Sequence, residues 1–135
     1  MKNGLFSVAL LAACLAGAKS VEWNTPESLA TTTCDPATYV SFASIDARDF
    51  SEVVVRMKVE GAVAAGNCQL FWAGPGRKVA EVSSVSLPVT VDGAFHDYRF
   101  PVGANRTWRG RINHFRFDPV QVAGLRVTIE SVRLR

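Results

Sequence analysis

Apolar and polar residues alternate with a period of two along most of the chain after residue 36. The clearest run is 53–59, where every second residue is apolar and Arg56 and Lys58 lie between the apolar positions. This period places alternate side chains on opposite faces of a β-strand, one face toward a core. It recurs in residues 39–45, 68–72, 85–91, 96–102, 108–119 and 125–134. The pattern predicts seven or eight short strands.

Turn residues separate these runs. They include Glu60-Gly61, Ala65-Gly66-Asn67, Gly74-Pro75-Gly76, Asp92-Gly93, Gly103-Ala104-Asn105 and Ala123-Gly124. No stretch after residue 36 shows a helical period with caps, so the chain is expected to be all-β, an antiparallel β-sandwich. Pro88 places its strand at a sheet edge, because proline cannot donate to a central ladder. Residues 21–36 are expected to be a lead-in to a single domain that spans 21–135.

The first twenty residues have the pattern of a signal peptide: an early lysine, a short apolar run and small residues. Cleavage is expected near Ala18 or Ser20. The alternative is a lipobox, Leu11-Ala12-Ala13-Cys14, which would make Cys14 a lipid-anchored N-terminus. The apolar run is short for a membrane span, and no other segment approaches about 18 apolar residues. We therefore expect an exported protein, secreted or periplasmic or else lipid-anchored to the envelope, with no transmembrane segment.

Cleavage of the leader leaves two cysteines, Cys34 and Cys68. In an oxidising compartment such a pair predicts one disulfide, and the alternative is two separate buried thiols. Neither cysteine has another cysteine or a histidine within a few residues, so the pair does not make a zinc site.

The charge of the chain is less basic than its pI of about 9.0 suggests. The leader contains Lys2 and Lys19 and no acid, so its loss lowers the net charge from +3 to +1. This small charge argues against a nucleic-acid binder. A local basic patch is still expected, since five arginines fall within residues 99–116.

Three C-terminal segments together resemble galactose-binding-like jelly-roll domains, a fold common among carbohydrate-binding modules. They are FHDYRFPV (95–102), WRGRINHFRFDP (108–119) and GLRVTIESVRLR (124–135). FSEVVVRMKV and CQLFW match the first half of that pattern in order and spacing, so the resemblance covers about residues 37–135. It implies a jelly-roll β-sandwich that binds carbohydrate in many members and has structural or protein-binding roles in others.

The resemblance also implies a structural calcium ion, held in part by an acidic residue of the last strand. The corresponding residue of this chain is Glu130, where aspartate is commoner in the pattern. No other cofactor is expected.

A sugar site would need aromatic planes and planar polar groups. The candidate ligand-binding residues are Trp108, Arg109, Arg111, Asn113, His114, Tyr98 and Arg99. Trp108 is also a candidate for closing the edge of the core, and Trp72 continues the apolar face of its strand and is expected in the core. In the stretch 108–119, Phe115 and Phe117, with Ile112 reached across a bulge, are expected to face the core.

The arginines have two interpretations. They are solvated residues that keep the sheet soluble, or they bind acidic groups of a polymer through bidentate contacts. Arg56, Lys58, Arg111 and Arg116 would share a face if their strands were neighbours. His96 and His114 could meet across a sheet, and Asn105-Arg106-Thr107 is a glycosylation sequon in a eukaryotic source.

The chain carries no hydrolase, metalloprotease or phosphate-loop motif, and Gly74-Pro75-Gly76-Arg77-Lys78 fits a hairpin loop better than a phosphate loop. We therefore expect a protein that is not an enzyme. The first hypothesis is a secreted, non-catalytic carbohydrate-binding-like module that contacts a glycan or cell-envelope polymer. The alternative is a structural or protein-interaction domain of the envelope without a sugar site.

Overall fold

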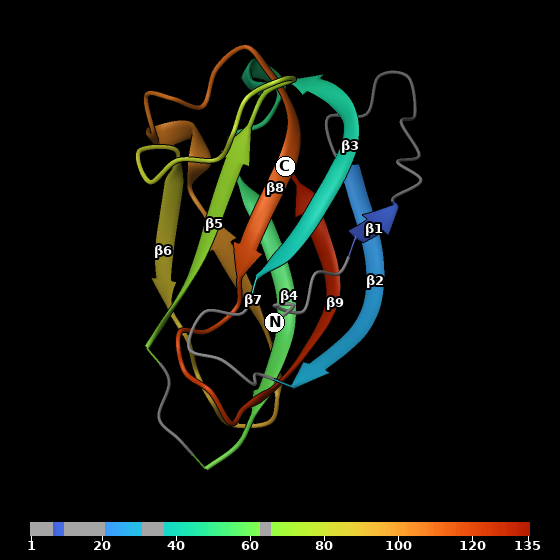
Figure 1. Cartoon of the computed structure of the whole chain (residues 1–135), viewed down its shortest axis with the longest axis vertical. Helices are drawn as coiled ribbons and strands as arrows, with labels where there is room; N and C mark the ends of the chain where they lie inside the picture. Colours follow the sequence, from blue (N-terminus) through green and yellow to red (C-terminus); the bar gives the residue numbers. More distant parts are fainter. Residues whose placement is uncertain (1–6, 10–20, 31–36, 63–65) are drawn as a thin grey trace.

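The computed structural model describes the backbone of residues 7–9 and 21–30, and residues 37–62 and 66–135 in full. The described strands form two sheets that pack face to face (Figure 1). The first sheet has the order β1 (Ser7–Ala9), β3 (Thr38–Asp46), β8 (Arg111–Asp118), β5 (Asn67–Ala73) and β6 (Ser84–Pro88). The second has the order β2 (Val21–Ala30), β9 (Arg126–Leu134), β4 (Val53–Glu60) and β7 (Phe95–Phe100). Two short 3-10 turns, η1 (Ala47–Asp49) and η2 (Val102–Ala104), connect strands at one end.

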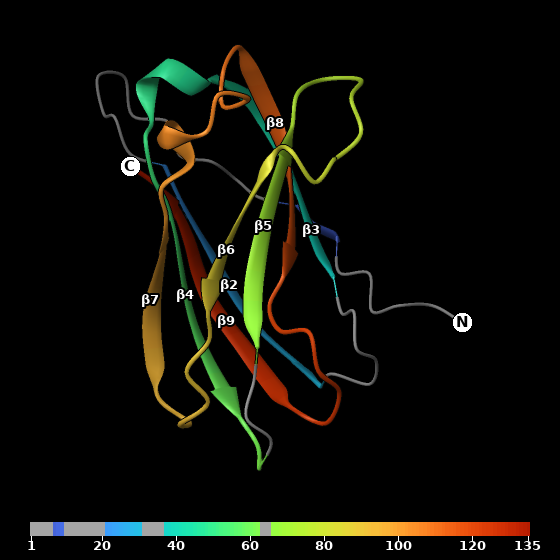
Figure 2. The ribbon, with the colours of Figure 1, turned by 90° about the vertical axis from the view of Figure 1, so that its left-hand side faces the viewer.

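The chain passes from one sheet to the other at almost every connection after β3. It runs from β3 to β4, back to the hairpin β5–β6, and then through β7, β8 and β9 in alternating sheets (Figure 2). Every pairing is antiparallel except that of β1 with β3. The predicted all-β jelly-roll sandwich is confirmed, and Pro88 ends β6, which is an edge strand as expected.

Side chains that alternate along the strands meet between the two sheets. Val53, Val55, Met57 and Val59 of β4 are all fully buried, as their period predicted. On the facing sheet, Phe117 of β8 lies edge-on to Phe100 of β7, with 6.0 Å between the ring centroids. Burial of such apolar surface is the main stabilising contribution in a sandwich of this size.

The bulge expected near Ile112 is an irregularity in the pairing of β3 with β8. Ser41 pairs with His114 and Ile45 pairs with Ile112, so three residues of β3 lie opposite one residue of β8. The extra residues are thus in β3 and not in the stretch 108–119, where the bulge was expected. Along β8, Ile112 and Phe115 are both buried although they are three positions apart. The expectation that Ile112, Phe115 and Phe117 face the core is confirmed.

The segment predicted to be a lead-in contains a strand. β2 pairs with β9 along most of its length, with a shift between Asn24 and Glu27, and forms an edge of the second sheet. The weak alternation of residues 21–30 concealed it, because β-structure at an edge depends on pairing with a neighbour more than on its own pattern. Residues 31–36, including Cys34, lie outside the described residues.

Most of the predicted leader, including Cys14, also lies outside the described residues. Within the leader, Ser7–Ala9 forms β1 and pairs in parallel with Tyr39–Ser41. Cleavage near residue 20 would remove this strand and leave β3 at the sheet edge. No helix among the described residues has the length and apolar character needed to cross a membrane.

Cys68 is a free thiol in this structure, and the predicted disulfide with Cys34 is not formed. The side chain is fully buried, and its Sγ donates a hydrogen bond to the carbonyl of Leu87 at 3.5 Å. Burial raises the pKa of the thiol to about 12. The thiolate needed for oxidation is therefore scarce in the folded protein.

Candidate functional site

The candidate ligand-binding residues lie in the core, on the outer faces of the two sheets, and at the end of the sandwich where β5 ends and β8 begins. Trp108 belongs to the core: it is 7% exposed, and its Nε1 donates to the carbonyls of Ala47 and Phe50 at 2.9 and 2.7 Å. Its ring meets Trp72 edge-on at 5.4 Å and stacks on Phe115 at 6.4 Å. These contacts support the alternative that Trp108 closes the edge of the core, and its buried indole offers no stacking face to a sugar.

Tyr98 is also a core residue, 7% exposed. The amide of Thr90 donates to its hydroxyl at 3.2 Å, and burial raises the pKa of the phenol. Trp72 is 2% exposed, as expected for the core face of β5. Because Trp72, Tyr98 and Trp108 are all buried, these three rings offer no stacking face to a sugar.

Arg99 lies on the outer face of the second sheet, in a network of ion pairs. Its Nη1 is 3.2 Å from Glu52, and Arg56 contacts both Asp97 and Glu130. Asp97 also binds Arg133 at 3.2 Å. The charges of this face are therefore balanced among neighbours, as the interpretation of solvated face residues requires.

The four basic residues that could have shared a face do not share one. Arg56 and Lys58 are on β4 in the second sheet, whereas Arg111 and Arg116 are on β8 in the first. The alternation of each strand was correct, but membership of a sheet depends on pairings that the pattern does not encode.

The two histidines are likewise separated between sheets. His96 binds Asp92 at 2.8 Å, and His114 lies on β8, stacked with Tyr39 at 5.8 Å and within 3.3 Å of Ser41 Oγ. Burial lowers the pKa of His114, so this ring is neutral at pH 7. Its neighbour Asn113 is half-buried.

Glu130 does not fit the predicted calcium site. It is exposed on the outer face of the second sheet, where its carboxylate accepts a hydrogen bond from Arg56 Nε at 2.6 Å. A cation there would have to compete with the guanidinium. Across residues 37–62 and 66–135, no group of three or more His, Cys, Asp or Glu side chains could hold a metal ion.

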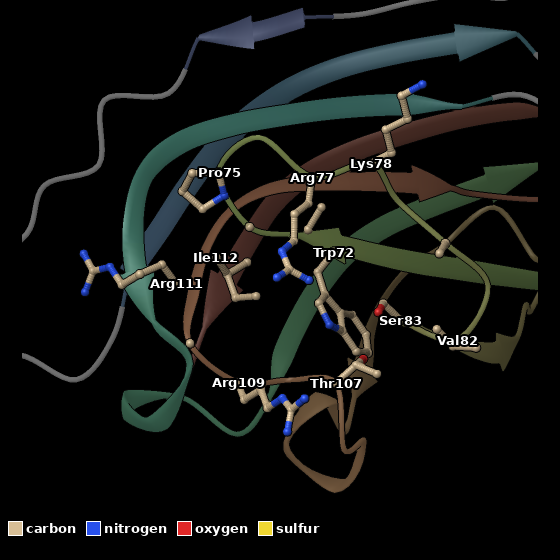
Figure 3. A pocket seen from close by; sticks show the side chains of 14 residues that line it. Trp72, Pro75, Arg77, Lys78, Val82, Ser83, Thr107, Arg109, Arg111 and Ile112 are labelled. Atoms are coloured by element: carbon tan, nitrogen blue, oxygen red, sulfur yellow. The ribbon is translucent and has the colours of Figure 1, made fainter.

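A hollow that we call the end cleft lies where β5 ends and β8 begins (Figure 3). Its volume is about 700 Å³, within the range of ligand sites. One wall is the hairpin loop after β5 and the other is the segment that leads into β8. The lining residues are Trp72, Ala73, Gly74, Pro75, Arg77, Lys78, Ala80, Val82, Ser83, Thr107, Arg109, Gly110, Arg111 and Ile112.

The two walls approach closely because residue 74 is a glycine. A Cβ at Gly74 would lie 2.5 Å from the carbonyl oxygen of Arg111. This clash is with a backbone atom, so the backbone itself would have to move to remove it. This approach brings the loop with Arg77 next to Arg111 and Ile112, the first residues of β8. The hairpin loop predicted for Gly74–Lys78 is confirmed, since β5 and β6 pair directly, but its place in the cleft was not foreseen.

Gly74→Ala should therefore lower the free energy of unfolding by about 1–3 kcal/mol, because the new methyl group forces the loop off β8. Chemical denaturation followed by tryptophan fluorescence measures the change. Gly66→Ala is the matched control, since no atom lies within 4 Å of the added Cβ. We expect that control to change stability by less than about 0.5 kcal/mol, and equal losses in both variants would contradict the packing argument.

Trp72 and Ile112, both buried, form the floor of the end cleft, and cations stand around it. Figure 3 shows Arg77 extending over the cleft from the hairpin loop and Arg109 extending from the opposite wall. Lys78 extends outward at the rim in the same view. Arg111 turns toward β3, where its Nη2 donates to the carbonyl of Ser44 at 2.8 Å.

The floor also carries an unused donor. The Nε1 of Trp72 is buried and has no hydrogen-bond partner within the described part of the chain. Buried polar atoms in proteins are normally paired, so this unpaired indole N–H is an exception among the buried groups of the core.

A smaller hollow of about 340 Å³ lies on the outer face of the first sheet, beneath residues 79–81. Its polar groups are engaged with one another: Arg116 binds Asp118 at 2.9 Å, and Gln69 Nε2 donates to Glu81 at 2.8 Å. Arg116 also lies over the ring of Phe71 at 5.1 Å. The end cleft is therefore the better candidate site.

Sequence analysis identified Arg109 and Arg111 of the end cleft but missed Arg77 and Lys78. The available signal was the pair of cations beside two glycines and a proline, a composition typical of an exposed loop tip. Only the pairing of β5 with β8 brings that loop to Arg109.

No family model matches the chain, and no curated protein matches it. Solved structures that are similar to it include carbohydrate-binding modules. A low-affinity xylan-binding module of family 86 from Roseburia intestinalis has a TM-score of 0.44 and 14% identity, over 86% of this chain and 68% of that one. A variant of a family 29 carbohydrate-binding module has a TM-score of 0.45 and 12% identity, over 86% and 70%. A chain from Bacillus endospore appendages, described as disulfide-linked pili, has a TM-score of 0.41 and 12% identity, over 93% and 97%.

Proposed function

We propose that the protein is an exported, non-catalytic carbohydrate-binding module, and that it contacts a glycan or cell-envelope polymer through the end cleft. The observation that carries this proposal is the cleft itself, an open hollow whose apolar floor is surrounded by donors. The guanidinium groups of Arg77 and Arg109 and the hydroxyls of Ser83 and Thr107 supply polar groups along its walls. Such convergent polar groups around an apolar floor are typical of ligand sites.

Export rests on the leader pattern of residues 1–20, and the mass of the mature N-terminus tests it. A mass beginning near residue 19 or 21 supports cleavage to a free protein, and a lipid-modified Cys14 supports an envelope anchor. An unprocessed Met1 would contradict export.

The glycan contact is tested by affinity electrophoresis of the purified protein through gels that contain neutral or acidic polysaccharides. We expect retention by at least one polymer, and a loss of about tenfold or more in affinity for Ser83→Trp, whose indole would fill the cleft. Ser86→Trp is the matched control, because Ser86 is exposed on β6 and does not line the cleft. Retention by no polymer, with the protein folded by circular dichroism, would contradict the carbohydrate proposal.

A protein-interaction role is the second candidate, and one residue favours it. Val82 is 72% exposed at the rim of the end cleft, and among the described residues it is the only large hydrophobic side chain so exposed. Exposed apolar side chains beside a polar rim occur at protein interfaces. If no polysaccharide is retained, this role becomes the leading hypothesis.

A further inference from the structure

The charge of the end cleft has one sign. Four of its fourteen lining residues are basic, and none of the fourteen is Asp or Glu. Away from the cleft, by contrast, arginines are largely neutralised by carboxylates, as in Arg48–Asp46, Arg56–Glu130, Arg99–Glu52, Arg116–Asp118 and Arg133–Asp97. A protein of small net charge has thus gathered cations at one cavity without compensating acids.

The cations of the end cleft also lack partners of their own. Within residues 37–62 and 66–135, Arg77, Lys78 and Arg109 form no ion pair, and only Arg111 is held, through Ser44. Arg106 and Arg126 also form no ion pair with the described side chains, but neither of them lines the cleft. The distinguishing feature is therefore the convergence of unpaired cations on one hollow. Their mutual repulsion is relieved when an anion enters.

We infer that the end cleft takes a polysaccharide that bears carboxylate groups, such as a polyuronate, with Arg77 and Arg109 contacting it from opposite walls. This inference rests on the proposed function and specifies its ligand class. The planar guanidinium presents paired N–H donors at the spacing of a carboxylate, which makes arginine the side chain suited to this contact.

Negative charge on the polymer should dominate the affinity. Calorimetric titrations of the purified protein with polygalacturonate and with its fully methyl-esterified form compare the same sugar backbone with and without charge. We expect polygalacturonate to bind at least about tenfold more tightly, and its affinity to fall as salt rises, because charge-assisted contacts are screened. Equal affinity for the two polymers would overturn the inference.

The double variant Arg77→Gln/Arg109→Gln locates the contact. We expect it to weaken polygalacturonate binding by about a hundredfold, with about tenfold from each guanidinium. The control Arg106→Gln/Arg126→Gln removes the same charge outside the cleft and should change affinity by less than about threefold. Equal losses in the two variants would overturn the inference, because they would indicate net charge and not the cleft. Unchanged melting temperatures show that both variants fold.

Two further outcomes separate this inference from the proposed function. If neutral polysaccharides bind and polygalacturonate does not, the proposed function stands and the anionic ligand is wrong. If neither binds, both are wrong. Dextran sulfate tests which anion the cleft prefers. If the protein binds dextran sulfate more tightly than polygalacturonate, and Arg77→Gln/Arg109→Gln loses that binding, the cleft is a sulfate site and the inferred carboxylate ligand is wrong.

Discussion

Replacement of Trp108 by alanine should lower the free energy of unfolding by about 3–5 kcal/mol, the cost of removing a buried aromatic side chain and leaving a cavity. The indole fills the space between Trp72 and Phe115 and ties η1 to the segment that leads into β8. Chemical denaturation at equilibrium measures the loss. A loss this large is a substantial fraction of the roughly 5–15 kcal/mol that stabilises a typical domain.

Trp108→Phe separates packing from hydrogen bonding at the same position. It keeps an aromatic ring but removes the donor shared by the carbonyls of Ala47 and Phe50, which should cost about 1–3 kcal/mol. Because the ring is buried, we expect this variant to retain glycan affinity when folded. A folded Trp108→Phe protein that loses glycan binding would show that Trp108 contacts the ligand after all.

Cys68 should react with iodoacetamide at pH 8 about a thousand times more slowly in the native protein than an ordinary thiol does. Burial raises its pKa from 9.0 to about 12, so the reactive thiolate is about a thousandfold less abundant. Full burial of the side chain slows the reaction further. Timed alkylation followed by peptide mass spectrometry gives the rate, and a denatured sample provides the reference.

The same measurement tests the disulfide that the sequence predicted. A free Cys68 gains one alkyl group after denaturation without reductant, whereas a disulfide to Cys34 blocks that gain until a reductant is added. Rapid alkylation of the native protein would contradict the burial of the thiol.

Trp72 and Trp108 show what could and what could not be predicted about the candidate site from the sequence alone. Trp72 was expected in the core because Cys68, Leu70 and Trp72 occupy one face of a strand, and this was correct. Trp108 stands at a loop end, where alternation has not begun, and its burial was left undecided. The deciding contacts come from Ala47 and Phe50, about sixty residues earlier in the chain.

The pattern of alternate apolar residues by itself determined the all-β fold and the core face of most strands. It did so because side chains on a strand point to opposite faces with a fixed period, whatever the neighbours are. It did not reveal β2, an edge strand whose formation depends on pairing with β9. It also could not assign strands to sheets, and so it placed Arg56 and Lys58 as potential neighbours of Arg111 and Arg116.

Only the tertiary structure decided the end cleft. The cavity forms because β5 lies next to β8, and because Gly74 lets the loop after β5 approach Arg111. Arg77 and Arg109 are far apart in the sequence, and nothing in the local pattern of either residue refers to the other. A strand pattern specifies which face a side chain takes, whereas the meeting of two loops at one end of a sandwich follows from strand pairing, which is a property of the whole chain.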